Sequence, residues 1–332
     1  MYYFIVNPAS GSGRGRTVWN TVRTELDRNN ILYKDFLLSR RGEARALAAS
    51  LSHSKQPFTL IVVGGDGTIN ETIDGLFSGL DLSVERKYSK KGHTPEDILC
   101  KEDRVIPHIT FGCIPTGSGN DFVRGLHLAK DPIEALHAIL DPKELCPINI
   151  GITQSGQKKR FFAVSSGIGF DASVCNCVLD SGLKNALNRF HSGKLVYMFT
   201  ALWILLTMKR KTLYVTINDG AAQAFPNAYF AAAMNLRYEG GGFLFCPDAK
   251  ADDGCLDLIV ANNISRLRAL TVLPLALFGR HTNKRGVTIC RCKTATIKTN
   301  APLCVHTDGE IPGFFEEVSF SLHEKKLAVI IR

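Results

Sequence analysis

Two kinds of apolar pattern alternate along the first part of the chain. Short runs rich in β-branched and aromatic residues, such as residues 2–6 and 59–63, have the pattern of buried strands. Longer stretches between them carry apolar residues every three or four positions, as at Val18, Val22 and Leu26, which predicts helices that pack through one face. Alternating strands and helices predict a parallel sheet covered on both faces.

The alternation continues up to residue 140. It predicts further strands and helices, in chain order, at 35–38, 44–51, 69–77, 109–114 and 132–140. Asp131 is the expected N-cap of the last helix, with Pro132 at its first position. Residues 85–106 are polar and charged and have no periodicity, so we expect an exposed insertion there.

The pattern changes near Pro142. Most later apolar segments are short and separated by turns, which predicts a largely antiparallel β structure with strands at 161–164, 213–217, 229–233, 256–260, 287–292 and 294–298. Two helices are expected, near 195–206 and 265–278. The apolar run at 195–208 is shorter than the roughly 20 residues that cross a bilayer, so we expect a buried helix. Alternation before and after residues 324–326 predicts a terminal hairpin.

At 332 residues the chain is long for a single core, and two domains are expected. The change of pattern places an α/β domain at 1–141 and a β-rich domain at 142–316, with 317–332 returning to the first. The N-terminal residues are apolar only as far as Val6, without the basic leader of a secretory signal, so we expect a cytoplasmic protein. The ten cysteines lack the spacing of zinc ligands, so we expect reduced thiols.

The chain is basic, with 40 Lys and Arg residues against 31 Asp and Glu residues, for a net charge of +9. The segment 280–298 is densely basic and contains no acidic residue. Such a surface suits nucleotide phosphates or the anionic face of a membrane, although a solvated basic face without a partner remains an alternative. Nucleic acid is not expected, because no recognised binding motif or interleaving of aromatic and basic residues accompanies the charge.

Three loops rich in Gly, Ser, Thr and Asn each connect a predicted strand to a predicted helix. They are residues 7–13, 64–68 and 115–122. The backbone amides of such a turn, together with a helix N-terminus, form a seat for phosphate. The carboxyl ends of parallel strands converge on one crevice, so the three loops are expected to meet there.

The loops differ from the common nucleotide motifs. Gly11, Gly13 and Gly15 do not fit the dinucleotide fingerprint G-x-G-x-x-G, and the Lys-Ser/Thr ending of a P-loop is missing. In the second loop three glycines allow a phosphate chain to approach the backbone closely. Asp66 places a carboxylate suited to Mg²⁺ beside them, and Asp121 adds another at the third loop.

With these loops the sequence resembles the diacylglycerol kinase catalytic-domain family, which includes bacterial lipid kinases and the sphingosine kinases. The motifs that carry the resemblance span nearly the whole chain: NPASG at 7–11, GGDGTINE at 64–71, PTGSGNDF at 115–122, GIGFDASV at 167–174, PDAKADDGCLDL at 247–258 and DGE at 308–310. The resemblance implies an NAD kinase/diacylglycerol kinase-like fold. Its α/β Rossmann-like domain would bind nucleotide, its β-sandwich domain would bind the lipid, and the active site would lie in the cleft between them.

The resemblance also implies which residues bind the cofactors, ATP and Mg²⁺. ATP is expected to be lined by Asn7, Pro8, Ala9, Ser10, Gly11, Ser39, Gly64, Gly65, Asp66, Gly67, Thr68, Ile69, Asn70 and Ser118. Asp66 is also expected to help place Mg²⁺ during catalysis. A separate structural Mg²⁺ site is expected at the Asp253 carboxylate and the backbone carbonyls of Lys250 and Cys255.

The catalytic proton acceptor implied by the resemblance is Glu310, with Asp308 as a second catalytic carboxylate. Residues two apart in an extended segment face the same way, so both carboxylates are expected to point in one direction. The alternative is a tight turn around Gly309. Asp171 is expected either near the lipid head group or in a structural turn.

The expected reaction transfers the γ-phosphate of Mg-ATP to a lipid hydroxyl, with diacylglycerol as the first candidate and phosphatidic acid as its product. The alternatives are a sphingoid base or another lipid alcohol, a soluble kinase of the NAD kinase type, and a catalytically inactive lipid-binding protein. A lipid substrate implies peripheral contact with a membrane, through 280–298 or 87–91. The sequence leaves open whether the chain forms a homodimer.

Overall fold

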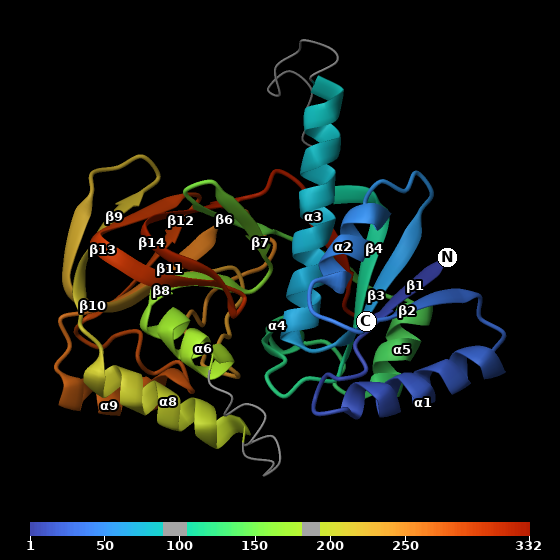
Figure 1. Cartoon of the computed structure of the whole chain (residues 1–332), viewed down its shortest axis with the longest axis horizontal. Helices are drawn as coiled ribbons and strands as arrows, with labels where there is room; N and C mark the ends of the chain where they lie inside the picture. Colours follow the sequence, from blue (N-terminus) through green and yellow to red (C-terminus); the bar gives the residue numbers. More distant parts are fainter. Residues whose placement is uncertain (89–104, 181–192) are drawn as a thin grey trace. The chain divides into compact units, whose positions relative to one another are not determined.

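The computed structural model describes residues 1–88, 105–180 and 193–332. The chain forms two compact units, one made of Met1–Ile150 and His323–Arg332 and the other of Gly151–Leu322. Each unit is built on its own sheet, on which helices pack (Figure 1).

The first unit contains a six-stranded sheet with the strand order β2-β1-β3-β4-β15-β5. Its strands are β1 (Tyr2–Val6), β2 (Tyr33–Leu37), β3 (Phe58–Gly64), β4 (Val105–Pro115), β5 (Leu145–Ile148) and β15 (Lys326–Ile330). All neighbouring pairs are parallel except β15 with β5. The carboxyl ends of β2, β1, β3 and β4 therefore lie along one edge.

Helices cover the sheet of the first unit. They are α1 (Arg14–Arg28), α2 (Glu43–Leu51), α3 (Asp66–Tyr88), α4 (Asp121–Gly125) and α5 (Pro132–Leu140). Phe4 and Ile61 of the sheet form one core with Val22 of α1 and Leu136 of α5. The predicted N-cap of α5 is confirmed, because the Asp131 carboxylate accepts hydrogen bonds from the amides of residues 133 and 134.

The second unit contains a nine-stranded antiparallel sheet in the order β12-β11-β10-β8-β13-β14-β6-β7, with β9 paired to β10 and β13. The strands are β6 (Gly151–Ser155), β7 (Lys158–Phe162), β8 (Ser165–Gly169), β9 (Lys211–Ile217), β10 (Gln223–Met234), β11 (Leu256–Asn262), β12 (Val287–Cys292), β13 (Ala295–Thr307) and β14 (Glu310–Leu322). Both β10 and β13 pair with β8 through one part and with β9 through another. The sheet therefore bends back on itself and encloses a core.

Among the described residues of this unit, the helices that pack on the second sheet are α6 (Phe170–Asp180), α8 (Gly193–Thr207) and α9 (Arg266–Ala276). Side chains of β10 alternate between two cores, as strand geometry requires. Ala231 and Ala233 belong to the enclosed core, whereas Ala232 and Met234 pack in the cluster that includes the helices. The predicted combination of a parallel α/β unit and an antiparallel β unit is confirmed.

The expectation of an exposed insertion at 85–106 is wrong at its C-terminal end. Residues up to Tyr88 continue α3, and Val105 already begins β4. The last turn of α3 is polar, so it gave no periodic signal, whereas Ile106 is buried in the sheet. Residues 89–104 lie outside the described residues.

The expected terminal hairpin is also wrong. Strand β14 pairs with β13 and β6 in the second unit, whereas β15 pairs with β4 and β5 in the first. The boundaries expected at 141/142 and 316/317 accordingly differ from the observed division, which falls after Ile150 and after Leu322. The apolar alternation identified both strands but could not identify their partners.

The expectation of a buried helix at 195–208 is wrong for one face of α8. Ala201 and Leu205 are buried, but Phe199 and Trp203 are about two thirds exposed. Among the described residues, no helix has the length and apolar character needed to span a membrane.

Candidate functional site

The three glycine-rich loops meet at the carboxyl edge of the first sheet, as their sequence positions predicted. Backbone hydrogen bonds continue between neighbouring strands as they enter the loops. The Asn7 amide donates to the Val63 carbonyl over 2.9 Å, and the Thr116 amide donates to the Gly64 carbonyl over 2.9 Å. Strand register therefore fixes where each loop begins.

Polar side chains tie the first loop to the other two. The Asn7 Nδ2 group donates to Thr68 Oγ1 over 2.9 Å, which joins the first loop to the second. Ser10 Oγ lies 2.6 Å from Thr116 Oγ1, which joins the first loop to the third. Ser10 Oγ also donates to the Asn7 carbonyl, so the Thr116 hydroxyl is the donor in the second contact. These bonds hold the three loops as one assembly.

Two close backbone contacts in this assembly require glycine. A Cβ atom on Gly11, where φ is +56°, would lie 2.1 Å from the Thr116 carbonyl oxygen. A Cβ atom on Gly117 would lie 2.8 Å from the Gly65 Cα atom. Any larger residue at these positions would push the loops apart, so the glycines bring the backbone amides of three loops close to each other.

Asp66, the first residue of α3, connects the second loop to the third. Its Oδ1 atom accepts a hydrogen bond of 3.3 Å from the Phe122 amide in α4. Burial raises the pKa of the Asp66 carboxyl, while the backbone amides of residues 120–122 and the Arg124 guanidinium oppose that shift. The carboxylate that was expected to place Mg²⁺ is thus also a structural link between loops.

The predicted nucleotide residues of the second loop divide into two groups. The side chains of Thr68, Ile69 and Asn70 are buried, and Asn70 has no exposed surface. Gly65 and Asp66 are partly exposed and Gly67 is exposed, at the start of α3. The first amides of a helix have no partner within that helix. This loop therefore offers backbone amides to a phosphate, while its buried side chains support the turn.

The remaining predicted nucleotide residues lie at the same edge. Pro8 is partly exposed, and Ala9 and Ser118 are exposed. Ser39 follows β2, whose carboxyl end lies beside that of β1. The Ser39 hydroxyl donates to Glu43 Oε1 over 2.8 Å, and its amide donates to Oε2 over 2.7 Å.

Two carboxylates at this edge were missed from the sequence. Glu43 accepts the two hydrogen bonds from Ser39, and the backbone bond is the main cause that lowers the pKa of the Glu43 carboxyl. Glu71 accepts a hydrogen bond of 2.9 Å from the Gly42 amide. A serine followed by a glutamate before a helix resembles a capping box, although the spacing is four residues rather than three. That pattern was the available signal for Glu43.

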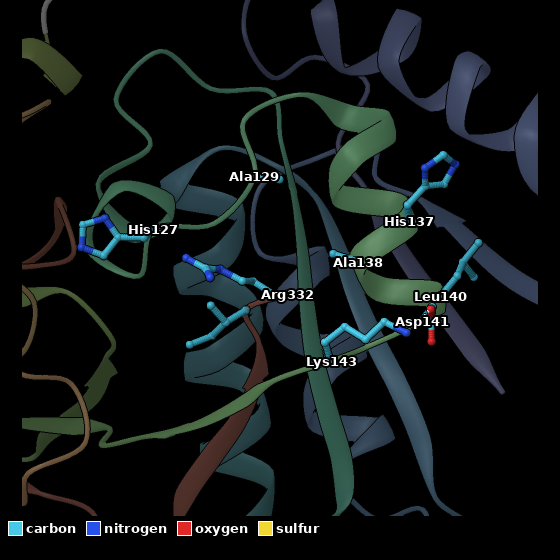
Figure 2. Close-up of a pocket in the computed structure, with 9 residues that line it drawn as sticks. His127, Ala129, His137, Ala138, Leu140, Asp141, Lys143 and Arg332 are labelled. Atoms are coloured by element: carbon cyan, nitrogen blue, oxygen red, sulfur yellow. Dashed lines mark hydrogen bonds and ion pairs between the residues drawn. The ribbon is translucent and has the colours of Figure 1, made fainter.

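A cavity of about 660 Å³ in the first unit does not coincide with these loops. Its lining comes from α5, from the segments before and after that helix and from the C-terminal end of the chain, and includes His127, His137, Lys143 and Arg332 (Figure 2). No residue of the three loops lines it. These four side chains are exposed at its rim. The loop assembly, rather than this cavity, remains the candidate nucleotide site.

In the second unit, Asp308 and Gly309 form the two-residue turn between β13 and β14. Both have positive φ angles, 48° and 82°, and the flanking residues Thr307 and Glu310 pair with each other. The expectation that Asp308 and Glu310 lie on one face of an extended segment is therefore wrong. The Asp-Gly sequence forms a turn because these two residue types accept positive φ.

Asp308 anchors this turn through its carboxylate. The two oxygens accept hydrogen bonds from the amides of Ala163, Val164 and Ser165, with lengths of 2.9, 3.0 and 2.8 Å. The side chain is thus committed to the connection between β7 and β8. Glu310 is the partly exposed first residue of β14, directly after the anchored turn.

A buried histidine lies beneath the same turn. His306 Nε2 lies 2.9 Å from Asp171 Oδ2 and 3.0 Å from Glu239 Oε1, and all three side chains are buried. Burial alone would lower the pKa of His306, but the two carboxylates outweigh it and raise that pKa well above its ordinary value. We interpret the group as a buried ion pair, although imidazole and carboxylates are also metal ligands.

His306 also contacts the turn that carries Glu310. The Gly309 amide points at His306 Nδ1 over 3.3 Å, a long contact that requires this nitrogen to be unprotonated. The two carboxylates at Nε2 favour the protonated ring, in which Nδ1 carries a hydrogen and cannot accept this bond. Sequence reasoning missed His306 and Glu239, because the three members of the cluster come from distant segments and have no common motif.

The residues expected to form a structural Mg²⁺ site do not favour one. Asp253 Oδ1 accepts a hydrogen bond of 3.0 Å from the Cys255 amide, and Oδ2 lies 2.5 Å from the Arg291 guanidinium. A carboxylate paired with a cation is a poor ligand for a second cation, since Mg²⁺ prefers open anionic oxygens. With Asp253 paired to Arg291, the expected site does not offer a free carboxylate to bind Mg²⁺ together with the backbone carbonyl of Lys250.

Two family models match the chain. The model described as Diacylglycerol kinase catalytic domain matches residues 1–150, and the model described as YegS C-terminal NAD kinase beta sandwich-like domain matches residues 164–330. YtlR of Bacillus subtilis (strain 168), named as a candidate lipid kinase, is 28% identical over 317 residues, which cover 94% of each chain. A diacylglycerol kinase of Staphylococcus saprophyticus is 25% identical over 310 residues, which cover 93% of this chain and 88% of that protein.

Solved structures share the fold. A candidate diacylglycerol kinase from Bacillus anthracis str. Sterne matches with a TM-score of 0.71 at 21% identity, over 100% of this chain and 95% of that one. An NAD kinase from Archaeoglobus fulgidus in complex with ATP matches with a TM-score of 0.52 at 12% identity, over 99% and 93% of the two chains. Together the two family models span nearly the whole sequence, and the chain therefore belongs to the diacylglycerol kinase catalytic-domain family, as a lipid kinase that phosphorylates an alcohol group.

Proposed function

We propose that this chain transfers the γ-phosphate of Mg-ATP to the hydroxyl group of diacylglycerol and so forms phosphatidic acid. The observation that carries the proposal is the assembly of three glycine-rich loops at the carboxyl edge of the parallel sheet. Ligands of open α/β sheets bind at this edge, where neighbouring connections leave on opposite sides. In the order β2-β1-β3-β4 that point lies between β1 and β3, where the first two loops begin.

The nucleotide is held mainly by backbone groups. The first amides of α3, with the partly exposed Gly65 and Asp66, present positive partial charge to the phosphates. Ser118 on the third loop and Asn7 to Gly11 on the first complete the set we propose. Phosphoryl transfer depends mainly on positioning and neutralisation of charge, so a fixed amide cluster and the Mg²⁺ that accompanies ATP supply most of the catalysis.

Glu310 is the proposed proton acceptor. In the transfer step, the lipid oxygen forms a bond to the γ-phosphorus, the bond from that phosphorus to the bridging oxygen of ADP breaks, and the hydroxyl proton passes to the Glu310 carboxylate. Asp308 is better assigned as a positioning residue, because its oxygens are occupied by three amides. His306 lies beneath Gly309 in the strand that leads into the turn, where Asp171 and Glu239 hold its side chain.

Phosphorylation of NAD is the main competing function, because an NAD kinase shares the fold. The match of residues 1–150 to the diacylglycerol kinase catalytic domain and the PTGSGNDF loop favour a lipid acceptor. We further propose that the chain acts in the cytoplasm, as a peripheral protein at the membrane surface.

A panel of acceptors tests the proposal. Purified chain would be incubated with terminally labelled Mg-ATP and, in separate reactions, diacylglycerol in mixed micelles, a sphingoid base, undecaprenol, or NAD. We expect label in phosphatidic acid above label in every other product. Label in NADP with none in a lipid would contradict the proposal, and preferential labelling of another lipid would replace diacylglycerol as the acceptor.

A further inference from the structure

One face of α8 carries large apolar side chains that are exposed to solvent. Phe199, Leu202, Trp203 and Leu206 are 65%, 40%, 68% and 38% exposed. Their spacing of three, four and seven residues places them on one side of a helix. The other side packs in the core through Ala201 and Leu205. The exposed residues are therefore a continuous face, whereas single exposed apolar residues on a surface are ordinary.

Helix α9 packs beside α8 (Figure 1), and its segment also carries exposed apolar side chains. Leu267 in α9 is 79% exposed, and Phe278, just after α9, is 71% exposed. We call the six residues Phe199, Leu202, Trp203, Leu206, Leu267 and Phe278 the α8–α9 surface. It combines two Phe residues and a Trp residue with aliphatic side chains.

The two segments that carry this surface, residues 193–218 and 258–280, contain basic side chains and no Asp or Glu. The sequence has no Asp or Glu between Asp180 and Asp219, and none between Asp257 and Asp308. The exposed cations nearest to the two helices in sequence are Lys209, Arg266, Arg268 and Arg280. Later in the basic segment, Arg291 and Lys298 pair with the carboxylates of Asp253 and Glu317. Lys209, Arg266, Arg268 and Arg280 therefore place exposed positive charge on the segments that form the α8–α9 surface.

This combination identifies the chemistry of the partner. A second copy of the chain would bring two surfaces of like charge together, which is unfavourable. An anionic bilayer satisfies both features, because its headgroups attract Lys and Arg and its acyl region accepts Leu and Phe. Trp residues are enriched at the level of the headgroups. The 15-residue α8 is too short to cross a bilayer and is suited to lie along it.

We propose that the α8–α9 surface docks this kinase onto an anionic lipid bilayer. The inference rests on the proposed function, because an enzyme that phosphorylates diacylglycerol must reach a substrate held in a membrane. The proposal assigns membrane contact to the surface of α8 and α9. It does not assign this contact to the whole basic segment 280–298, nor to residues 87–91, which lie partly outside the described residues.

Tryptophan fluorescence offers a direct test, because the chain has two tryptophans and Trp19 is buried in the first unit. A Trp19→Phe variant leaves Trp203 as the single reporter. We expect its emission to shift to the blue with phosphatidylglycerol vesicles and brominated lipid to quench it. Phosphatidylcholine vesicles should give a much smaller shift. An emission spectrum that anionic vesicles leave unchanged would overturn the proposal.

Two further variants measure the contribution of the apolar side chains. Phe199→Ser combined with Leu206→Ser should lower the partition coefficient onto anionic vesicles at least about tenfold, since two side chains no longer enter the bilayer. Leu32→Ser is the matched control, because Leu32 is 82% exposed and belongs to the first unit. Its partition should equal that of the unmodified chain. Equal loss in both variants, or loss in neither, would contradict the proposal.

Vesicle binding is measured without ATP, so it is independent of catalysis. If binding follows the expected pattern but no lipid is phosphorylated, the proposed function fails and the docking surface stands. In a kinase assay, the double variant should lose activity on vesicles yet retain it on a water-soluble short-chain diacylglycerol. If light scattering instead showed a dimer that the double variant dissociates, with no vesicle binding, the occupant would be a second copy and the proposal would be wrong.

Discussion

At the scale of single residues, Glu310 has the most specific role in the proposed reaction. Replacing its carboxylate by an amide in Glu310→Gln removes the proton acceptor without a change of size. General-base catalysis typically contributes about 10² to 10⁴ in rate, so we expect kcat to fall by that factor. The dissociation constant for Mg-ATP, measured by calorimetry, should change little.

Glu317→Gln provides a matched control for this substitution. Glu317 lies on the same strand, is exposed, and pairs with Lys298 over 3.1 Å. Exposed pairs contribute little to stability, so this variant should keep full activity. Full activity in Glu310→Gln would disprove the role assigned to Glu310.

Asp308 is expected to act through the turn rather than on the substrate. In Asp308→Asn, one of the two acceptor oxygens becomes an amide nitrogen, and the three amides of residues 163–165 compete for the other. Hydrogen bonds to charged groups contribute about 1.5–3 kcal/mol each, so we expect a loss of stability of roughly that size in urea denaturation. Asp219→Asn, in an exposed turn of the same unit, should lose much less. Equal stability of the two variants would argue against the anchor.

His306 should make the stability of the chain depend on pH. Its pKa is raised in the folded state above the ordinary value of 6.5. The ion pairs with Asp171 and Glu239 therefore stabilise the fold fully below pH 6.5, and this stabilisation is lost as pH rises through the folded pKa. Urea denaturation at a series of pH values should show a decline above pH 6.5 that His306→Gln lacks. Parallel pH profiles for the two chains would contradict this role.

At the scale of structural elements, the contact between the second and third loops is the most sensitive point. A methyl group in Gly117→Ala would lie 2.8 Å from the Gly65 Cα atom and separate the loops. Because the proposed phosphate seat depends on their close approach, we expect Mg-ATP affinity to fall at least about tenfold, as a small displacement of positioned groups can cost that much. Calorimetry and circular dichroism would measure affinity and folding.

The control for general glycine effects is Gly156→Ala. Gly156 has a φ of +59° in the β6–β7 turn, with open space around a Cβ atom. This variant should lose some stability but keep its affinity for Mg-ATP. A Gly117→Ala variant that binds Mg-ATP as the unmodified chain does would show that the loop contact is not part of the site.

The sequence predicted those elements whose signals are local. The strand, turn and helix order, the Asp131 cap and the position of the three loops all follow from periodicity and turn chemistry within a few residues. Pairing is not local, so alternation at 318–322 and 327–331 indicated two strands but not that they join different sheets. Helix α8 is apolar on nearly all sides, so no polar stripe identified its exposed face.

In the candidate site, too, the sequence predicted the features with local signals and missed the contacts between distant segments. Motif positions and the resemblance gave the loops and Glu310, whereas contacts between distant segments had no sequence signal. His306 reaches Asp171 and Glu239 across large separations in sequence, and Arg291 reaches Asp253 in the same manner. The Arg291 pair also removed the charge argument for the expected Mg²⁺ site. Tertiary contacts determine which carboxylates are already paired with a cation or with backbone amides. The periodicity of the sequence does not show these contacts.

At the scale of the whole molecule, the net charge of +9 has a measurable consequence for membrane contact. Attraction between exposed charges is screened over about 10 Å at 0.1 M salt. We expect the partition coefficient onto phosphatidylglycerol vesicles to fall severalfold when the NaCl concentration is raised roughly tenfold, from about 0.05 to about 0.5 M. The part of the binding that is due to the apolar side chains should persist at high salt. Binding that does not respond to salt would argue against a contribution from the basic residues.

The two units divide the proposed chemistry, with the nucleotide loops in the first and Glu310 in the second. The most direct test is transfer of the labelled terminal phosphate of Mg-ATP to diacylglycerol in phosphatidylglycerol vesicles, followed by mass spectrometry of the lipid. We predict phosphatidic acid that carries the label, formed only with both substrates present and nearly absent with Glu310→Gln. A folded, active-site-intact chain that consumes no ATP and forms no phosphatidic acid, or does so equally with Glu310→Gln, would contradict the account.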